Sequence, residues 1–204
     1  AVTIILFFVM YIAGIIMFGG RGFAKVQNFL NLFISNAGLI VVATGMTIVM
    51  ITGGIDISVG SVVAMVCMML AWMMERGNIG AFPAILIVLA TGCIFGLVQG
   101  FLVAYLKIQP FIVTLATMNV AKGLAYVYTG GSPVRVVTKE WQFLGAGYVG
   151  GVPTPVILLA VVLVITAIIM NKTKLGRHIY AVGGNSQAAR FSGISTAKVK
   201  FLVH

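Results

Sequence analysis

One acidic side chain, Asp56, stands next to long apolar runs, in the segment Ile51-Thr-Gly-Gly-Ile-Asp-Ile-Ser-Val-Gly60. An ionisable group at the edge of an apolar span is a functional candidate, because burying its charge without a purpose is costly. The structural alternative is an N-cap, in which the carboxylate accepts backbone N–H bonds at the start of the next helix. We favour the cap, and both roles are compatible if Gly53-Gly54 interrupts a helix inside a membrane, as happens around transporter binding sites.

A second group of polar residues follows helical spacing. At 100° per residue, Asn119, Lys122, Tyr126 and Thr129 fall on one side of a helix. Such a face avoids lipid and meets protein or a water-filled path. The aliphatic stem of Lys122 could equally carry its ammonium outward to the interface, with no role in a path.

An earlier apolar run repeats this pattern with smaller side chains. Thr44 and Thr47 share a face with Asn36. They are candidates for the same path, although hydrogen bonding between helices explains them equally well.

The inventory of reactive residues argues against enzyme chemistry. Asp56, Glu75 and Glu140 are far apart in the sequence, and only His178 and His204 carry an imidazole. Zinc-protease, nucleophile-elbow and phosphate-loop motifs are absent, as are paired cysteines. We therefore predict no catalytic residue, no metal site and no cofactor on this chain, and any use of ATP must belong to a partner chain.

The elements that position these residues are predicted by composition. The chain is 61% hydrophobic and 8% charged, against about 25% charged residues in soluble domains. A spanning helix needs about 20 mostly apolar residues, and backbone groups in lipid must bond within their own helix. The sequence thus predicts an all-α, polytopic transmembrane bundle in a single domain, residues 1–204. The six expected spans are Ala1–Phe18, Asn36–Thr52, Ile57–Met74, Ala81–Leu106, Phe111–Thr129 and Pro155–Met170.

The distribution of charge predicts an orientation. Residues 171–200 carry six Lys or Arg and no acidic residue, so we expect this stretch in the cytoplasm, with weak support from the other loops. The net charge of +10 suits an anionic leaflet or an acidic partner surface. Nucleic acid is a poor partner, because the basic residues flank the spans. The apolar runs at both ends lead us to expect a piece of a longer subunit.

Small residues recur every fourth position in the fourth span, at Gly92, Gly96, Gly100 and Ala104. Such a face allows another helix to approach closely, so we predict a helix–helix seam there. Gln99 borders this seam and is expected to bond across it.

Two long segments carry a family resemblance. Gly45-Met-Thr-Ile-Val-Met-Ile-Thr-Gly-Gly-Ile-Asp-Ile-Ser-Val-Gly60-Ser resembles the GMT…GIDLSVGS signature of permeases in ribose-type sugar ABC importers. The segment from Thr173 to Ile194 is similar to the cytoplasmic coupling loop of that family. Gln109-Pro-Phe-Ile-Val-Thr-Leu and Tyr128-Thr-Gly-Gly-Ser-Pro133 also match, whereas Ile57 and Phe191 stand where Leu is usual.

The resemblance implies a permease of about ten helices in the cytoplasmic membrane of a bacterium, with about six present here. It implies three kinds of partner: a second permease subunit, cytoplasmic ATP-binding subunits, and a periplasmic or lipid-anchored sugar-binding protein. The alternative is an ion- or proton-coupled secondary transporter, a class that usually has several carboxylates in its spans.

Within the expected cytoplasmic coupling loop, residues 171–198, local signals predict a short helix from Asn185 to Gly193. Asn185 is a favoured N-cap and Gly193 a favoured helix end. Two turns are unstable alone, so we expect packing on an ATP-binding subunit to hold them. The expected contacts to that subunit are Asn185, Ala188, Ala189, Arg190, Phe191 and Gly193.

Overall fold

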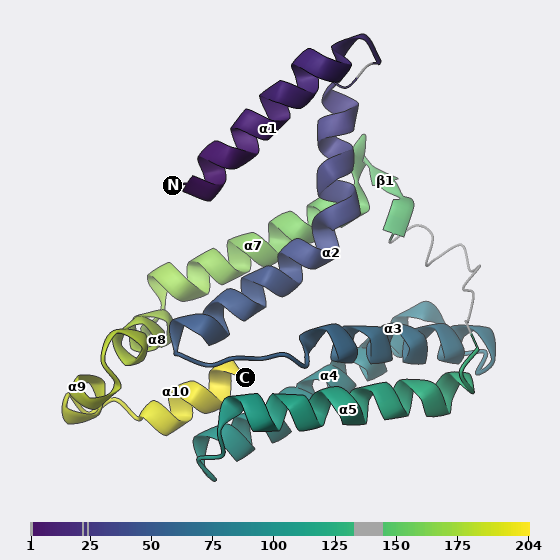
Figure 1. The fold of residues 1–204 in the computed structure, drawn as a ribbon. Coiled ribbons are helices and arrows are strands. Elements are labelled where there is room, and N and C mark those ends of the chain that lie inside the picture. The colour runs from purple at the N-terminus through teal and green to yellow at the C-terminus, as the bar shows by residue number, and fades with distance from the viewer. Residues whose placement is uncertain (1, 22, 24, 133–144) are drawn as a thin grey trace.

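The structure is a computed structural model that describes residues 2–21, 23, 25–132 and 145–204. Long apolar helices dominate it (Figure 1). The elements are α1 (Val2–Phe18), η1 (Gly19–Arg21), α2 (Val26–Ile51), α3 (Val59–Glu75), α4 (Ala81–Ala104), α5 (Pro110–Thr129), β1 (Tyr148–Val149), β2 (Val152–Pro153), α7 (Thr154–Lys172), α8 (Lys174–Gly184), α9 (Ser186–Phe191) and α10 (Thr196–Val203).

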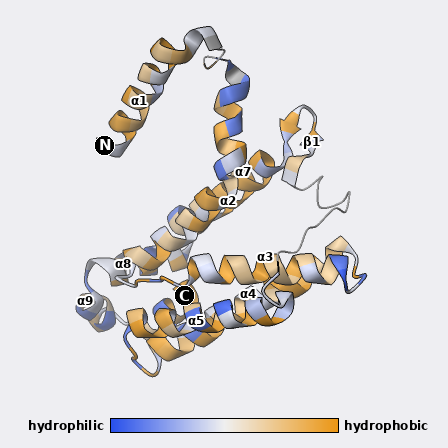
Figure 2. Ribbon diagram, turned by 45° about the vertical axis from the view of Figure 1, so that its right-hand side comes forward, coloured by the Kyte–Doolittle hydropathy of each residue, from blue (hydrophilic) through white to orange (hydrophobic). Residues whose placement is uncertain are grey.

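Each of the six expected spans corresponds to a helix, which confirms a polytopic helical membrane protein. Among the described residues, α2, α4, α5 and α7 are long and apolar enough to cross a bilayer, while α1 and α3 have 17 residues each. Hydrophobic residues run along the lengths of these helices, and hydrophilic ones gather at α9 and other ends (Figure 2). Most of the apolar side chains are exposed, as expected for a surface that contacts lipid.

One predicted boundary was wrong by several turns. The second span begins at Val26, ten residues before Asn36, because its first turns carry amides that a count of apolar residues excludes. On the surface of this extension, Gln27 donates a hydrogen bond to Asn31 at 3.4 Å. Polar side chains are compatible with a helix that continues beyond the apolar run.

A small hairpin departs from the all-α expectation. Strands β1 and β2 pair antiparallel, with Tyr148 opposite Pro153. Gly150 and Gly151 both adopt positive φ angles, 57° and 82°, which matches the glycine preference of two-residue hairpin turns.

Helices α3, α4 and α5 lie side by side, and α2 runs beside α7 (Figure 1). Aromatic rings of α1 meet the start of α2, where the Tyr11 and Phe29 centroids are 5.5 Å apart. Trp72 of α3 contacts Tyr128 of α5 at 5.8 Å. The bundle thus has two helical groups, joined through the residues between α2 and α3 and through α10, which packs on both α4 and α8.

The expected loop at residues 171–198 is mostly helical. Helices α8, α9 and α10 lie at the same end of the bundle as the α4–α5 connection (Figure 1). They share one hydrophobic cluster, which contains Ile179, Val182, Ala189 and Val199 and reaches Met170 of α7. The three helices are therefore packed against each other and against the bundle.

Candidate functional site

The helix break between α2 and α3 brings together the polar groups of the candidate site. Helix α2 ends at Ile51 and α3 starts at Val59, and the residues from Gly54 to Ser58 have no regular structure. Gly53 has a φ of +78°, which turns the chain out of α2 and is accessible to glycine without strain. The sequence predicted two helices separated near Gly53-Gly54, and the structure confirms a break between them.

Asp56 is held by Ser58 in this break. Its Oδ1 accepts hydrogen bonds from the Ser58 backbone N–H at 2.8 Å and from the Ser58 hydroxyl at 2.6 Å. The Ser58 Oγ in turn accepts a bond at 2.7 Å from Nε2 of Gln99, on α4. Ser58 is 1% exposed and Gln99 3%. A buried amide and a buried hydroxyl are therefore linked to the partly buried carboxylate of Asp56, which is the final acceptor of this chain of hydrogen bonds.

The interpretation of Asp56 as the N-cap was wrong. Ser58 occupies the N-cap position of α3, and its side chain makes no capping hydrogen bond. Asp56 lies two residues earlier and binds the N–H of Ser58 instead of a helical N–H. This local turn delays the start of the helix, because an aspartate that bonds two residues ahead competes with helical geometry.

A polar cavity of about 150 Å³ opens beside this chain of bonds. Asp56, Ser58 and Gln99 line it together with Phe95 and His204. Nε2 of His204 is buried and has no hydrogen-bond partner among the described residues. The cavity has room for several water molecules. Its acceptors and donors could exchange hydrogen bonds with hydroxyl groups.

One contact in the break was not anticipated. Thr114 of α5 is fully buried, and its Oγ1 lies 3.5 Å from the Ile55 carbonyl oxygen. In the sequence, this contact is indicated only by one polar residue, a threonine within the apolar segment that begins α5. Residues of α4 and α5 thus flank the break.

The other candidates for a path are not brought to this cavity. On α5, Asn119, Lys122 and Tyr126 are exposed, and the Asn119 amide donates to the Leu115 carbonyl at 3.0 Å. On α2, Thr44 and Thr47 donate to carbonyls one turn earlier, each at 2.7 Å. Only Asp56 of the six predicted path residues lines the polar cavity.

The seam on α4 faces α10. A Cβ atom added to Gly100 would lie 2.6 Å from the Phe201 carbonyl oxygen, and one added to Gly96 would lie 2.9 Å from that of His204. Ala104 is buried. At Gly92 nothing lies within 4 Å of an added Cβ, so the close approach involves Gly96 and Gly100.

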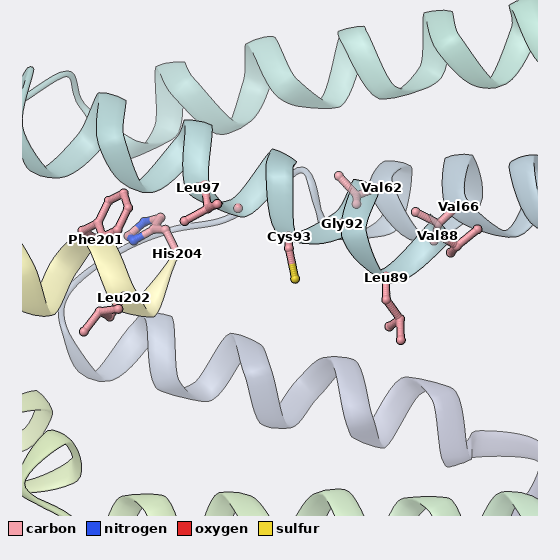
Figure 3. Close-up of a pocket in the computed structure, with 11 residues that line it drawn as sticks. Val62, Val66, Val88, Leu89, Gly92, Cys93, Leu97, Phe201, Leu202 and His204 are labelled. Carbon is pink, nitrogen blue, oxygen red and sulfur yellow. The ribbon is translucent and has the colours of Figure 1, made fainter. Parts of the chain in front are cut away.

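An apolar groove of about 620 Å³ continues from this seam, lined by α3, α4 and α10. At one end Phe201 and His204 lie near Leu97, and the groove extends past Cys93 to Leu89 (Figure 3). Its aliphatic lining offers few hydrogen bonds. The polar groups of the candidate site therefore line the smaller cavity at the break and not this groove.

Helix α9 confirms the predicted short helix. The side chain of Asn185 accepts hydrogen bonds from the N–H groups of Gln187 and Ala188, each at 3.0 Å. Gly193 ends the turn with a φ of +82°. Phe191 is 91% exposed, and Arg190 is exposed beside it.

Two expectations for α9 were wrong. Ala189 is 4% exposed and packs in the cluster of α8 and α10, so it is not a surface contact. That packing within the chain holds α9, whereas we expected a partner to be required. Ala188 is exposed on the opposite side.

Three known permeases are similar to this chain over about nine-tenths of its length. The ribose import permease protein RbsC of Escherichia coli K12 is 38% identical over 186 residues, which is 89% of this chain and 58% of the relative. The galactofuranose transporter permease protein YtfT of the same strain is 37% identical over 191 residues, covering 93% and 54%. The inner membrane ABC transporter permease protein YjfF, also of that strain, is 34% identical over 190 residues, covering 90% and 56%.

The chain spans a little over half the length of these relatives. No solved structure matches it significantly. These similarities confirm the resemblance stated from the sequence. A family model with the description "Branched-chain amino acid transport system / permease component" matches residues 28–204. The chain therefore belongs to this family of transport-system permease components.

Proposed function

We propose that the full-length protein is the membrane-spanning permease subunit of an ATP-driven importer for a simple sugar, such as a ribose-like monosaccharide, in the inner membrane of a bacterium. The observation that carries this proposal is the similarity to permeases whose names specify ribose and galactofuranose, across about nine-tenths of the chain. The family description mentions branched-chain amino acids. Individual relatives at 37–38% identity are more specific guides to substrate than the description of a broad family.

The groups that line the polar cavity fit a transported sugar better than a coupling ion. Its lining offers one carboxylate, one amide, one hydroxyl and the imidazole of His204, groups that suit the hydroxyls of a sugar. An ion-coupled transporter usually concentrates carboxylates in its spans, and Asp56 is the single acidic residue of this cavity. In this proposal Asp56 lies on the path, and the exposed polar face of α5 joins it when the subunit is complete.

The proposed partners follow from the same role. Two permease subunits form the path, cytoplasmic ATP-binding subunits drive it, and a sugar-binding protein delivers the substrate. Helix α9 and its neighbours form the coupling region, residues 171–198, in which Phe191 inserts into an ATP-binding subunit and Arg190 faces an acidic rim. The permease itself carries no cofactor and hydrolyses no ATP.

Reconstitution tests this function. The full-length subunit is placed in proteoliposomes with its ATP-binding subunit and sugar-binding protein, and uptake of radiolabelled ribose is measured. We expect uptake only with all components and ATP, and no ATP hydrolysis by the permease alone. Uptake that follows an imposed ion gradient without ATP would establish the ion-coupled alternative, and ATP hydrolysis by the purified permease would contradict the assignment.

Asp56→Ala is expected to reduce sugar uptake per assembled complex about tenfold or more, because a hydrogen bond to a charged group contributes about 1.5–3 kcal/mol. The amount of complex in the membrane should fall much less. Uptake is normalised to the complex recovered by affinity purification. Glu75→Gln is the matched control, since Glu75 is exposed at the opposite end of α3. Reduced assembly with normal uptake per complex would make Asp56 purely structural.

A further inference from the structure

A second polar cavity lies where α4, α5 and α10 meet, at the end of the bundle that carries α8 and α9. Its volume is about 310 Å³. Two ammonium groups line it, from Lys107 in the α4–α5 connection and from Lys200 on α10. No acidic residue is among its lining residues. The cavity therefore has an unbalanced positive charge.

The starts of two helices add to that charge. Gln109 and Pro110 line the cavity at the N-terminus of α5, and Thr196 and Ala197 line it at the N-terminus of α10. The first N–H groups of a helix have no partner within the helix, and its N-terminus carries a partial positive charge. The Gln109 side chain makes no capping hydrogen bond. Pro110 has no N–H, and the Ser195 hydroxyl already accepts a hydrogen bond from the Lys198 N–H at 3.4 Å. The two helix ends therefore add partial positive charge beside the two lysines, and not a full set of free donors.

The cavity lies at the connected ends of α4 and α5, two helices that are long and apolar enough to cross a bilayer. Val103 and Ala104, the last residues of α4, form its buried wall, while Lys107 and Gln109 are exposed. Lys107 has a φ of +55°, a conformation that glycine or asparagine adopts more readily than lysine. The cavity therefore combines apolar residues with two lysines, which suits a ligand that is partly apolar and partly anionic.

We propose that this cavity binds the phosphate group of an anionic membrane phospholipid, held by Lys107, Lys200 and the N-termini of α5 and α10. Basic pockets between helices on the cytoplasmic side are suited to anionic headgroups. A free phosphate would satisfy the same charges. The lipid source is favoured because the cavity lies at the connected ends of α4 and α5, two helices long enough to span a bilayer, where anionic headgroups are concentrated.

The test uses the full-length subunit in nanodiscs of phosphatidylethanolamine, with or without phosphatidylglycerol. Bound phosphatidylglycerol is counted by native mass spectrometry, and its dissociation constant is measured by titration. Lys107→Gln and Lys200→Gln should each weaken binding about fivefold, the effect of one basic residue near an anionic surface. Lys107→Arg and Lys200→Arg should preserve binding, which separates loss of charge from misfolding.

Lys198→Gln is the matched control, because Lys198 is an exposed residue of α10 that does not line the cavity. It should leave binding unchanged. An equal loss in Lys198→Gln would show diffuse attraction to the surface and overturn the site. Competition by inorganic phosphate as effective as that by phosphatidylglycerol would assign a free-anion site instead. Unchanged binding in both glutamine variants would remove the cavity from lipid recognition.

Discussion

Replacing Gly100 with leucine is expected to remove most of the folded full-length subunit from the membrane. The carbonyl oxygen of Phe201 lies 2.6 Å from the position of an added Cβ, and the Phe201 ring carbon Cδ2 lies 3.2 Å from it. A main-chain carbonyl cannot rotate away as a side chain can, so α4 and α10 must separate. Overpacking a tight contact costs about 1–3 kcal/mol or more, which lowers the folding equilibrium constant at least several-fold, and in cells such a loss can lower the amount of protein several-fold.

Alanine variants of Gly92 and Gly100 test the same contact with a single methyl group. In a helix, alanine is about 1 kcal/mol more favourable than glycine, so Gly92→Ala should be neutral or stabilising, since nothing lies within 4 Å of its Cβ. Gly100→Ala adds the same methyl group against a carbonyl and should destabilise. Monodisperse protein is quantified by fluorescence-detected size-exclusion chromatography over a temperature series. Equal stability of the two alanine variants would show that Gly100 does not pack against α10.

Phe191→Ala is expected to weaken binding of the ATP-binding subunit about thirtyfold or more and to abolish most sugar uptake. Phe191 is 91% exposed, so its ring contributes little to the stability of the permease. A bulky aromatic that enters a partner pocket often contributes 2 kcal/mol or more to binding. The dissociation constant is measured with the full-length permease in nanodiscs, and uptake is measured in proteoliposomes.

Tyr148→Ala is the matched control, because Tyr148 is an exposed aromatic of strand β1, outside the coupling region. Its effect on binding should be small. Gly193→Val tests the backbone, since a β-branched residue is strained at a φ of +82°, and it should also impair coupling. Wild-type binding and uptake in both Phe191→Ala and Gly193→Val would exclude α9 from the contact.

Local and hydropathic features of the fold were predictable from the sequence. The spans follow from apolar runs long enough for a bilayer, because the hydrogen-bonding requirement in lipid leaves few alternatives to helix. Helix α9 was predictable because Asn185 and Gly193 act within a few residues of their own positions. The early start of α2 was missed, since amides at a helix end carry no hydropathic signal.

Contacts between helices were less predictable. Gln99 was expected to bond across the seam, but its partner, Ser58, lies 41 residues away and on the side of the break. Ala189 was placed on the surface because its burial depends on α8 and α10, whose packing is not a local property. The helical spacing of Asn119, Lys122 and Tyr126 predicts a polar face on α5. Spacing alone does not determine which element that face contacts.

The contact between α4 and α10 can form only late in the synthesis of the chain. Gly100 and Phe201 are about 100 residues apart, and a ribosome adds about 5–20 residues per second, so α10 emerges on the order of 5–20 seconds after α4. During this interval the glycine face of α4 has no partner in the growing chain. Chaperones and proteases of the membrane therefore encounter an intermediate in which α4 is inserted and its closest neighbour has not yet been synthesised.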